Sequence, residues 1–169
     1  FNAYFLLLTR KFKQLFKIEE IRVYLGVIAV FTTLIAFNVR GCFGSLRESF
    51  HHSLFQVASI ITTTGFSTVD FNQWPAFSKL LLVLLMFIGA CAGSTGGGMK
   101  CSRILLLFKG VKKEMMSLIH PRLVRVHKMD GQRVQHEVMR SVNAFLVAYL
   151  IVIATSVLIV SLHCEDMVT

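Results

Sequence analysis

Long apolar runs constrain this chain more than any other feature of its sequence. Residues 23–39 form 17 positions without a charge, residues 142–162 form 21, and residues 80–108 form a longer, mainly apolar stretch. A helix needs about 20 apolar residues to cross a bilayer. Hydrophobic residues make up 54% of the chain and charged residues 16%, against about 25% charged in soluble domains. The sequence therefore predicts an all-α integral membrane protein.

The basic residues predict which ends of the spans face the cytoplasm. Of 18 Lys and Arg residues, five lie between positions 10 and 22 and ten between positions 100 and 140. Because cytoplasmic loops are enriched in basic residues, residues 9–22 and 109–140 are expected inside and residues 40–78 outside. The net charge of +9 then reflects topology and contact with membrane lipids, and no nucleic-acid partner is expected.

Residues 50–61 are apolar but too short to span a bilayer, which is typical of a re-entrant helix. Ser45 or Ser49 is suited to cap its start. The next residues, Thr-Thr-Thr-Gly-Phe-Ser-Thr at 62–68, resist helix continuation and favour an extended chain whose carbonyl groups can replace the hydration shell of a cation. We therefore expect a pore helix at about 45–61 and a filter segment at 62–68. The alternative is a plain turn in an outer loop.

A glycine-rich break interrupts the long apolar run at residues 89–98, where five of ten residues are glycine. A phosphate-binding P-loop is excluded, because Met99 separates Gly98 from Lys100 and the break lies inside a predicted span. We interpret residues 75–108 as a broken span whose unwound part lines a path and acts as a movable constriction. Close helix packing through small residues is the alternative.

Other chemistry finds little support in the sequence. The four cysteines have no paired or metal-binding spacing, and the histidines form no ligand set. No carboxylate pair or activated nucleophile is recognisable, so neither an enzyme nor a bound cofactor is expected. The charged residues 109–137 are interpreted as a cytoplasmic linker, either solvated or used to dock a partner.

The predicted organisation is that of a piece of a larger protein. Residues 1–22 are expected to be the end of a preceding span plus a cytoplasmic linker, and residues 23–108 one complete span–pore-loop–span repeat with its first span at 23–39. After the linker, residues 138–162 form the first span of the next repeat, and residues 163–169 begin its pore loop on the outer side.

Two motifs together resemble the Trk/Ktr/HKT potassium transporters. The first is Ser-Ile-Ile-Thr-Thr-Thr-Gly-Phe-Ser-Thr at 59–68, and the second is Gly-Ser-Thr-Gly-Gly-Gly-Met-Lys at 93–100. This resemblance implies four potassium-channel-like repeats around one pore, of which this chain holds the third. It implies potassium binding by the filter residues Thr63, Thr64, Gly65 and Phe66. It implies a gating intramembrane loop that contains Gly89, Gly93, Ser94, Thr95, Gly96, Gly97 and Gly98.

The same resemblance implies potassium uptake across a bacterial inner membrane through a gated pore. It further implies a homodimer and a cytoplasmic nucleotide-binding regulatory ring of the TrkA type, with potassium as the transported ion. The competing function is a non-conducting membrane scaffold in which both motifs only pack helices. A scaffold is expected to tolerate Gly65→Ala, whereas a filter is not.

Overall fold

A computed structural model describes residues 17–119, 128–129, 132–133 and 136–162 of the chain. Within these ranges the fold is helical apart from one short antiparallel strand pair, in agreement with the all-α prediction. The elements in chain order are α3 (Glu19–Asn38), the 3-10 turn η1 (Arg40–Cys42), α4 (Leu46–Ile61), η2 (Phe71–Gln73), α5 (Ala76–Ile88), α6 (Cys101–Ile119), β1 (Lys128–Met129), β2 (Gln132–Arg133) and α7 (His136–Ser161).

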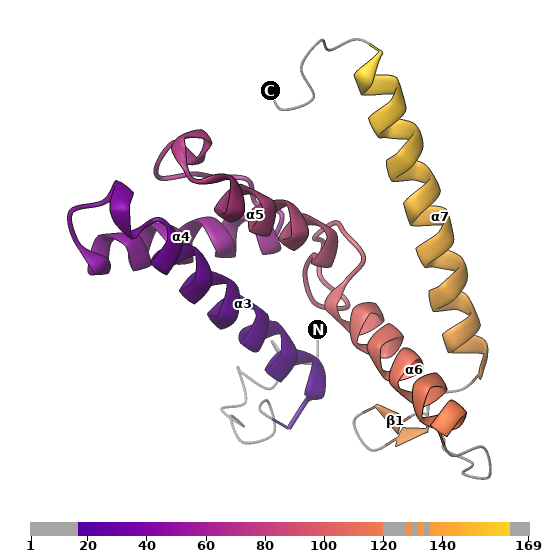
Figure 1. Ribbon diagram of the computed structural model, residues 1–169. Coiled ribbons are helices and arrows are strands. Elements are labelled where there is room, and N and C mark those ends of the chain that lie inside the picture. The colour runs from indigo at the N-terminus through magenta and orange to yellow at the C-terminus, as the bar shows by residue number, and fades with distance from the viewer. Residues whose placement is uncertain (1–16, 120–127, 130–131, 134–135, 163–169) are drawn as a thin grey trace. The chain divides into compact units, whose positions relative to one another are not determined.

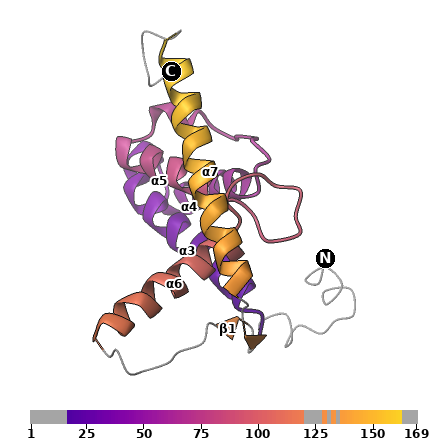
Figure 2. The same cartoon turned by 90° about the vertical axis from the view of Figure 1, so that its right-hand side faces the viewer.

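The chain divides into two compact units after Leu105, and each is described by itself. In the first unit, α3, α4 and α5 pack against one another (Figure 1). Two long connections, α4 to α5 and α5 to α6, carry the predicted filter segment and the glycine-rich break (Figure 2). The second unit contains most of α6, the strand pair and α7.

Two of the described helices are long and apolar enough to cross a membrane. α3 has 20 residues and contains an 18-residue stretch with a mean hydropathy of 1.8, and residues 137–161 of α7 contain one with a mean hydropathy of 2.6. α5 is also apolar but has only 13 residues. Glu19 and Glu20 occupy the first turn of α3, where negative charge is favoured by the helix dipole.

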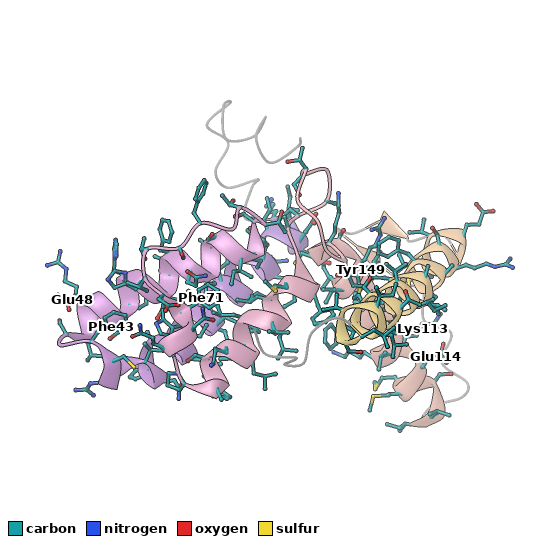
Figure 3. All side chains as sticks on the ribbon, turned by 90° about the horizontal axis from the view of Figure 1, so that it is seen from above. Phe43, Glu48, Phe71, Lys113, Glu114 and Tyr149 are labelled. Atoms are coloured by element: carbon teal, nitrogen blue, oxygen red, sulfur yellow. The ribbon has the colours of Figure 1, made fainter. Side chains whose placement is uncertain are left out.

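The helix α4 begins at a capped N-terminus. Ser45 is the N-cap residue, and its hydroxyl accepts a hydrogen bond from the Arg47 N–H at 3.3 Å. Ser49, the other candidate cap in the sequence, lies inside the helix and is fully buried. Glu48 lies in the first turn, exposed, and projects into the open (Figure 3). These features fix the residue at which α4 starts. The filter segment follows directly after its last residue, Ile61.

An apolar core holds the three helices of the first unit together. The completely buried apolar side chains include Ile35 of α3, Val39 directly after α3, Val57 and Ile61 of α4, and Leu85 of α5. One polar bond ties α3 to α5, because the buried Ser78 hydroxyl donates to Asn38 Oδ1 at 2.7 Å. This core fixes the position of the α4 C-terminus relative to the end of α5.

Some predicted segments differ from the structure or lie outside its described part. α6 continues past residue 108 to Ile119, into the segment interpreted as a linker, because residues 109–119 are rich in Lys, Glu, Met and Leu, which are good helix formers. α7 covers 136–161, where the sequence predicts a span at 138–162. Three predicted parts lie outside the described residues. They are residues 1–16, which hold the predicted end of the preceding span and most of the linker that follows it, part of the linker at 109–137, and residues 163–169.

Candidate functional site

The filter segment, residues 62–68, starts directly at the C-terminus of α4. The Thr62 N–H still donates to the Ala58 carbonyl at 3.1 Å, but the Thr63 N–H donates to the Ile60 carbonyl at 3.0 Å, which tightens the last turn. Thr63 and Gly65 both have positive φ angles, 57° and 82°. Because a β-branched residue rarely adopts such an angle, Thr63 is held there by its surroundings. Helix α4 therefore ends in a sharp reversal of the backbone.

Ser59 fixes the path of the filter segment from inside α4. Its carbonyl accepts hydrogen bonds from the N–H groups of Thr64 at 2.9 Å and Gly65 at 3.4 Å. Its buried hydroxyl donates to the Phe66 carbonyl at 2.5 Å. One residue of the helix thus binds three successive residues of the segment.

These bonds orient the carbonyl groups of the filter segment. Every peptide bond that the structure describes is trans, so the carbonyl of one residue points opposite to the N–H of the next. Because the N–H groups of Thr64 and Gly65 point at Ser59, the carbonyls of Thr63 and Thr64 point away from the end of α4. The Phe66 carbonyl instead points back to Ser59. Two neighbouring carbonyl oxygens therefore point away from the end of α4, on an exposed stretch of chain.

The side chains of the filter segment make local hydrogen bonds that stiffen it. The hydroxyls of Thr62 and Thr64 lie 2.8 Å apart, and the Thr62 hydroxyl donates to the Ala58 carbonyl at 2.7 Å. At the far end, His52 Nδ1 lies 3.0 Å from the Thr68 hydroxyl oxygen. The segment is thus attached to α4 at both of its ends.

Residues 89–98, which we call the glycine loop, leave α5 and return to the same place. Gly89 ends α5 with a φ of 67°, and Gly98 has a φ of 81°. A Cβ atom on Gly98 would lie 2.9 Å from the Gly89 Cα, and one on Gly89 would overlap the Gly97 carbonyl oxygen. Only glycine fits this close crossing, so the two glycines form the neck of the loop.

Hydrogen bonds within the glycine loop hold the rest of its backbone. The Ser94 hydroxyl donates to the Cys91 carbonyl at 2.6 Å, and the Lys100 ammonium donates to the Ser94 carbonyl at 3.1 Å. Gly93 has a φ of 78°, and Thr95 is exposed. The loop is therefore a compact unit that connects to α5 and α6 through its neck.

The structure brings the two sequence motifs into direct contact. The Gly97 N–H donates to the Thr63 hydroxyl at 3.2 Å. A Cβ atom on Gly96 would lie 3.2 Å from that hydroxyl oxygen and 3.4 Å from the Thr62 carbonyl oxygen. The glycine loop thus lies against the beginning of the filter segment, and the glycines allow its backbone to approach that closely.

On its other side the glycine loop is attached to the beginning of α3. Glu20 Oε1 accepts a hydrogen bond from the Ala92 N–H at 2.6 Å, although the two residues are 72 positions apart.

Within the described part of the chain, no three His, Cys, Asp or Glu side chains gather into a metal site. The groups that the filter segment offers to a cation are backbone carbonyls and threonine hydroxyls, which suit a hard, weakly held ion.

Two residues of this arrangement were given no site role of their own in the sequence interpretation, although Ser59 begins the first of its two motifs. Ser59 is a serine on the buried face of an otherwise apolar helix end, and that placement was the available signal. Glu20 had no such signal, because its partner is a backbone N–H far away in the sequence.

Comparison with known proteins shows which family the chain resembles. The family model described as TrkH, cation transport protein, matches residues 3–168. The Trk system potassium uptake protein TrkH of Escherichia coli (strain K12) is 36% identical over 162 residues, which cover 94% of this chain and 33% of that protein. The Trk system potassium uptake protein TrkG of the same strain is 35% identical over 174 residues, covering 100% of this chain and 35% of that protein.

A solved structure is similar as well. The crystal structure of the potassium transporter TrkH from Vibrio parahaemolyticus has a TM-score of 0.79 and 37% sequence identity, over 85% of this chain and 31% of that one. The chain spans about a third of the length of the curated relatives it matches.

Proposed function

The chain belongs to the TrkH family of cation transport proteins, and we propose from this premise that it supplies one of four repeats around a potassium-conducting pore. Family membership confirms the resemblance drawn from the two motifs. It makes the chain part of a membrane transporter and not of an enzyme. Potassium uptake is the activity printed in the names of the relatives, and it comes to this chain as our proposal.

The observation that carries the proposal is the pair of outward-facing carbonyls on Thr63 and Thr64. Their oxygens are free of the α4 end because the adjoining N–H groups donate to Ser59. Rings of backbone carbonyls replace the hydration shell of potassium in selective pores. We propose that these two carbonyls and that of Gly65 coordinate the ion, while the Phe66 carbonyl, bound to the Ser59 hydroxyl, braces the segment.

The position of α4 favours a cation at the same place. A helix of 16 residues ends at Ile61, directly before the filter segment. The C-terminus of a helix carries a partial negative charge that falls off within about one turn. We propose that this end of α4 lowers the energy of a cation at the start of the filter segment, as a pore helix does. The other three filter strands would come from the remaining repeats of the longer protein.

We propose that the glycine loop is the gate of this pore. It touches the filter segment through the Gly97–Thr63 hydrogen bond, and its neck of two glycines with positive φ is a natural hinge. In the position seen here, which we call docked, the loop lies next to the filter segment and would obstruct an ion path. Displacement of the loop would open it.

The remaining parts of the proposal follow from the family resemblance. The longer protein would lie in a bacterial inner membrane, act as a homodimer and bind a cytoplasmic nucleotide-binding regulatory ring of the TrkA type. Its basic segments near positions 10–22 and 100–140 would lie on the cytoplasmic side, next to anionic lipids.

Rubidium uptake by cells that lack their own potassium transport tests the proposal, with the full-length parent at matched membrane abundance. Gly65→Ala is the informative variant, because φ is 82° there and nothing lies within 4 Å of the added Cβ. Its effect is therefore backbone strain of about 1–2 kcal/mol and no loss of packing. Gly44→Ala is the matched control, since its Cβ also meets nothing within 4 Å and its φ is ordinary.

Wild type and Gly44→Ala are expected to restore uptake, and Gly65→Ala is expected to lose it or to lose selectivity. Equal uptake by all three proteins would remove the filter segment from the ion path. Absence of uptake by the wild type would favour the scaffold function.

A further inference from the structure

The glycine loop is held from two sides, by different kinds of bond. Toward the filter segment, the bond from Gly97 to the Thr63 hydroxyl is neutral and 3.2 Å long. Toward the start of α3, the bond from Ala92 to the Glu20 carboxylate is charge-assisted and 2.6 Å long. Hydrogen bonds to an ionised acceptor are roughly twice as strong as neutral ones. The Glu20 bond is thus the stronger of these two attachments.

Because Glu20 is held at the start of α3, it accepts this hydrogen bond only when the glycine loop is docked. Glu20 is half-buried in the first turn of α3, whose core face is packed against α4. Ala92 is exposed, so its N–H can turn to water when the carboxylate is removed. Loss of the Glu20 side chain therefore costs the docked loop a hydrogen bond without opening a cavity in the core.

We propose that Glu20 is a positioning residue that holds the glycine loop in its docked, non-conducting place. This inference rests on the proposed function, because it assigns the restraint on the gate of that same pore. Release of Glu20 leaves the loop attached to the filter segment only by the neutral bond to Thr63, and the neck at Gly89 and Gly98 allows it to move. In this proposal, the gate is restrained from the start of α3, by Glu20, on the side that the proposed topology places toward the cytoplasm.

The docked position is measured independently of transport through the thiol of Cys91, which neighbours Ala92. Cys91 is partly exposed, whereas Cys101, at the start of α6, is buried. The purified full-length parent is treated with N-ethylmaleimide at several pH values, and modification at each cysteine is read by peptide mass spectrometry. The rate constant of the thiolate is compared between variants, because the charge of Glu20 also opposes ionisation of the Cys91 thiol. The variants are Glu20→Ala and Glu20→Gln, with Glu114→Ala as the control, because Glu114 is an exposed carboxylate on α6 (Figure 3).

Glu20→Ala is expected to raise the modification rate of Cys91 about tenfold, the ratio that corresponds to loss of one hydrogen bond to a charged group. Glu20→Gln keeps an acceptor oxygen and is expected to raise it by less than about threefold. Glu114→Ala is expected to leave it unchanged. The inference is overturned if Glu20→Ala matches the wild type, if Glu114→Ala gives the same rise, or if Cys101 reacts faster to the same extent, which would indicate separated helices.

Rubidium uptake with the same proteins, in cells without the regulatory ring, separates this inference from the proposed function. Faster uptake by Glu20→Ala than by the wild type supports the restraint on the gate, and unchanged uptake despite faster Cys91 modification overturns it. If no variant and no wild type transports rubidium, the proposed function fails, and the gating role of Glu20 fails with it. If uptake is present and abolished by Gly65→Ala while Glu20→Ala changes neither readout, only the Glu20 inference fails.

Discussion

Gly96→Ala is the sharpest perturbation of the contact between the glycine loop and the filter segment. An added Cβ would lie 2.9 Å from the Ala90 Cβ and 3.2 Å from the Thr63 hydroxyl oxygen. Gly96 has an ordinary φ, so alanine brings no backbone strain of its own. The effect of the substitution is therefore steric, and it falls partly inside the glycine loop, at Ala90, and partly at the contact with the filter segment, at Thr63.

The size of this effect follows from what the new methyl group meets. The Ala90 Cβ belongs to the glycine loop itself, so that contact strains the loop whether it is docked or displaced. Only the approach to the Thr63 hydroxyl oxygen at 3.2 Å and to the Thr62 carbonyl oxygen at 3.4 Å opposes docking. Inserting a methyl group into such a packed site costs about 1–3 kcal/mol. A value of about 1 kcal/mol, at the lower end of this range for approaches of 3.2 and 3.4 Å, shifts the ratio of docked to displaced loop by about fivefold. Cys91 is therefore expected to react with a maleimide about fivefold faster in Gly96→Ala, and rubidium uptake without the regulatory ring is expected to rise.

The neighbouring glycine provides a matched control. A Cβ on Gly97 would meet only the Thr63 Cγ2, at 3.9 Å, which is an ordinary contact distance. Gly97→Ala is thus expected to behave as the wild type. Ala90→Gly removes only the 2.9 Å contact inside the loop and is expected to leave the Cys91 reactivity of Gly96→Ala raised. The reasoning is refuted if Gly96→Ala and Gly97→Ala give the same Cys91 reactivity, or if Ala90→Gly alone returns the reactivity of Gly96→Ala to that of the wild type.

Three further substitutions separate the roles of the filter brace and the core. Ser59→Ala removes the donor to the Phe66 carbonyl, a loss of about 1 kcal/mol, and is expected to weaken the preference for rubidium over sodium in competition uptake, with Ser59→Thr closer to wild type. Ser78→Ala removes the hydroxyl bound to Asn38 Oδ1 and is expected to lower the thermal stability of the purified protein by about 1 kcal/mol, with the rubidium-to-sodium preference unchanged. Leu85→Ala removes a fully buried side chain from the core and is expected to lower the free energy of unfolding by about 2–5 kcal/mol in the same thermal measurement. A loss smaller than that of Ser78→Ala would contradict the described core.

The local features of this fold could be predicted from the sequence. Apolar length marked the long helices, Ser45 was one of two candidate caps, and the glycines at 89–98 marked a place where no helix holds. Each of these signals lies within a few residues of its effect. Helix propensity extended α6 beyond the predicted boundary at 108, because the charged residues that suggested a linker are also good helix formers.

The details of the site were not open to sequence reasoning. A positive φ at Thr63 contradicts the usual preference of a β-branched residue, and it is imposed by the turn at the end of α4. The hydrogen bond between Glu20 and Ala92 joins positions 72 apart and exists only because α3 and the glycine loop meet in the fold. Local patterns therefore predicted where helices begin and break, while tertiary packing determined which atoms meet.

The ratio of potassium to sodium permeability tests the central claim most directly. It is obtained from reversal potentials of the purified full-length parent in planar bilayers, for the wild type, Gly65→Ala and Gly44→Ala. The account predicts a clear potassium preference in the wild type and in Gly44→Ala, and its loss in Gly65→Ala, where the left-handed backbone that orients the carbonyls is strained. An identical permeability ratio in all three proteins, or no cation current at all in the wild type, would contradict it.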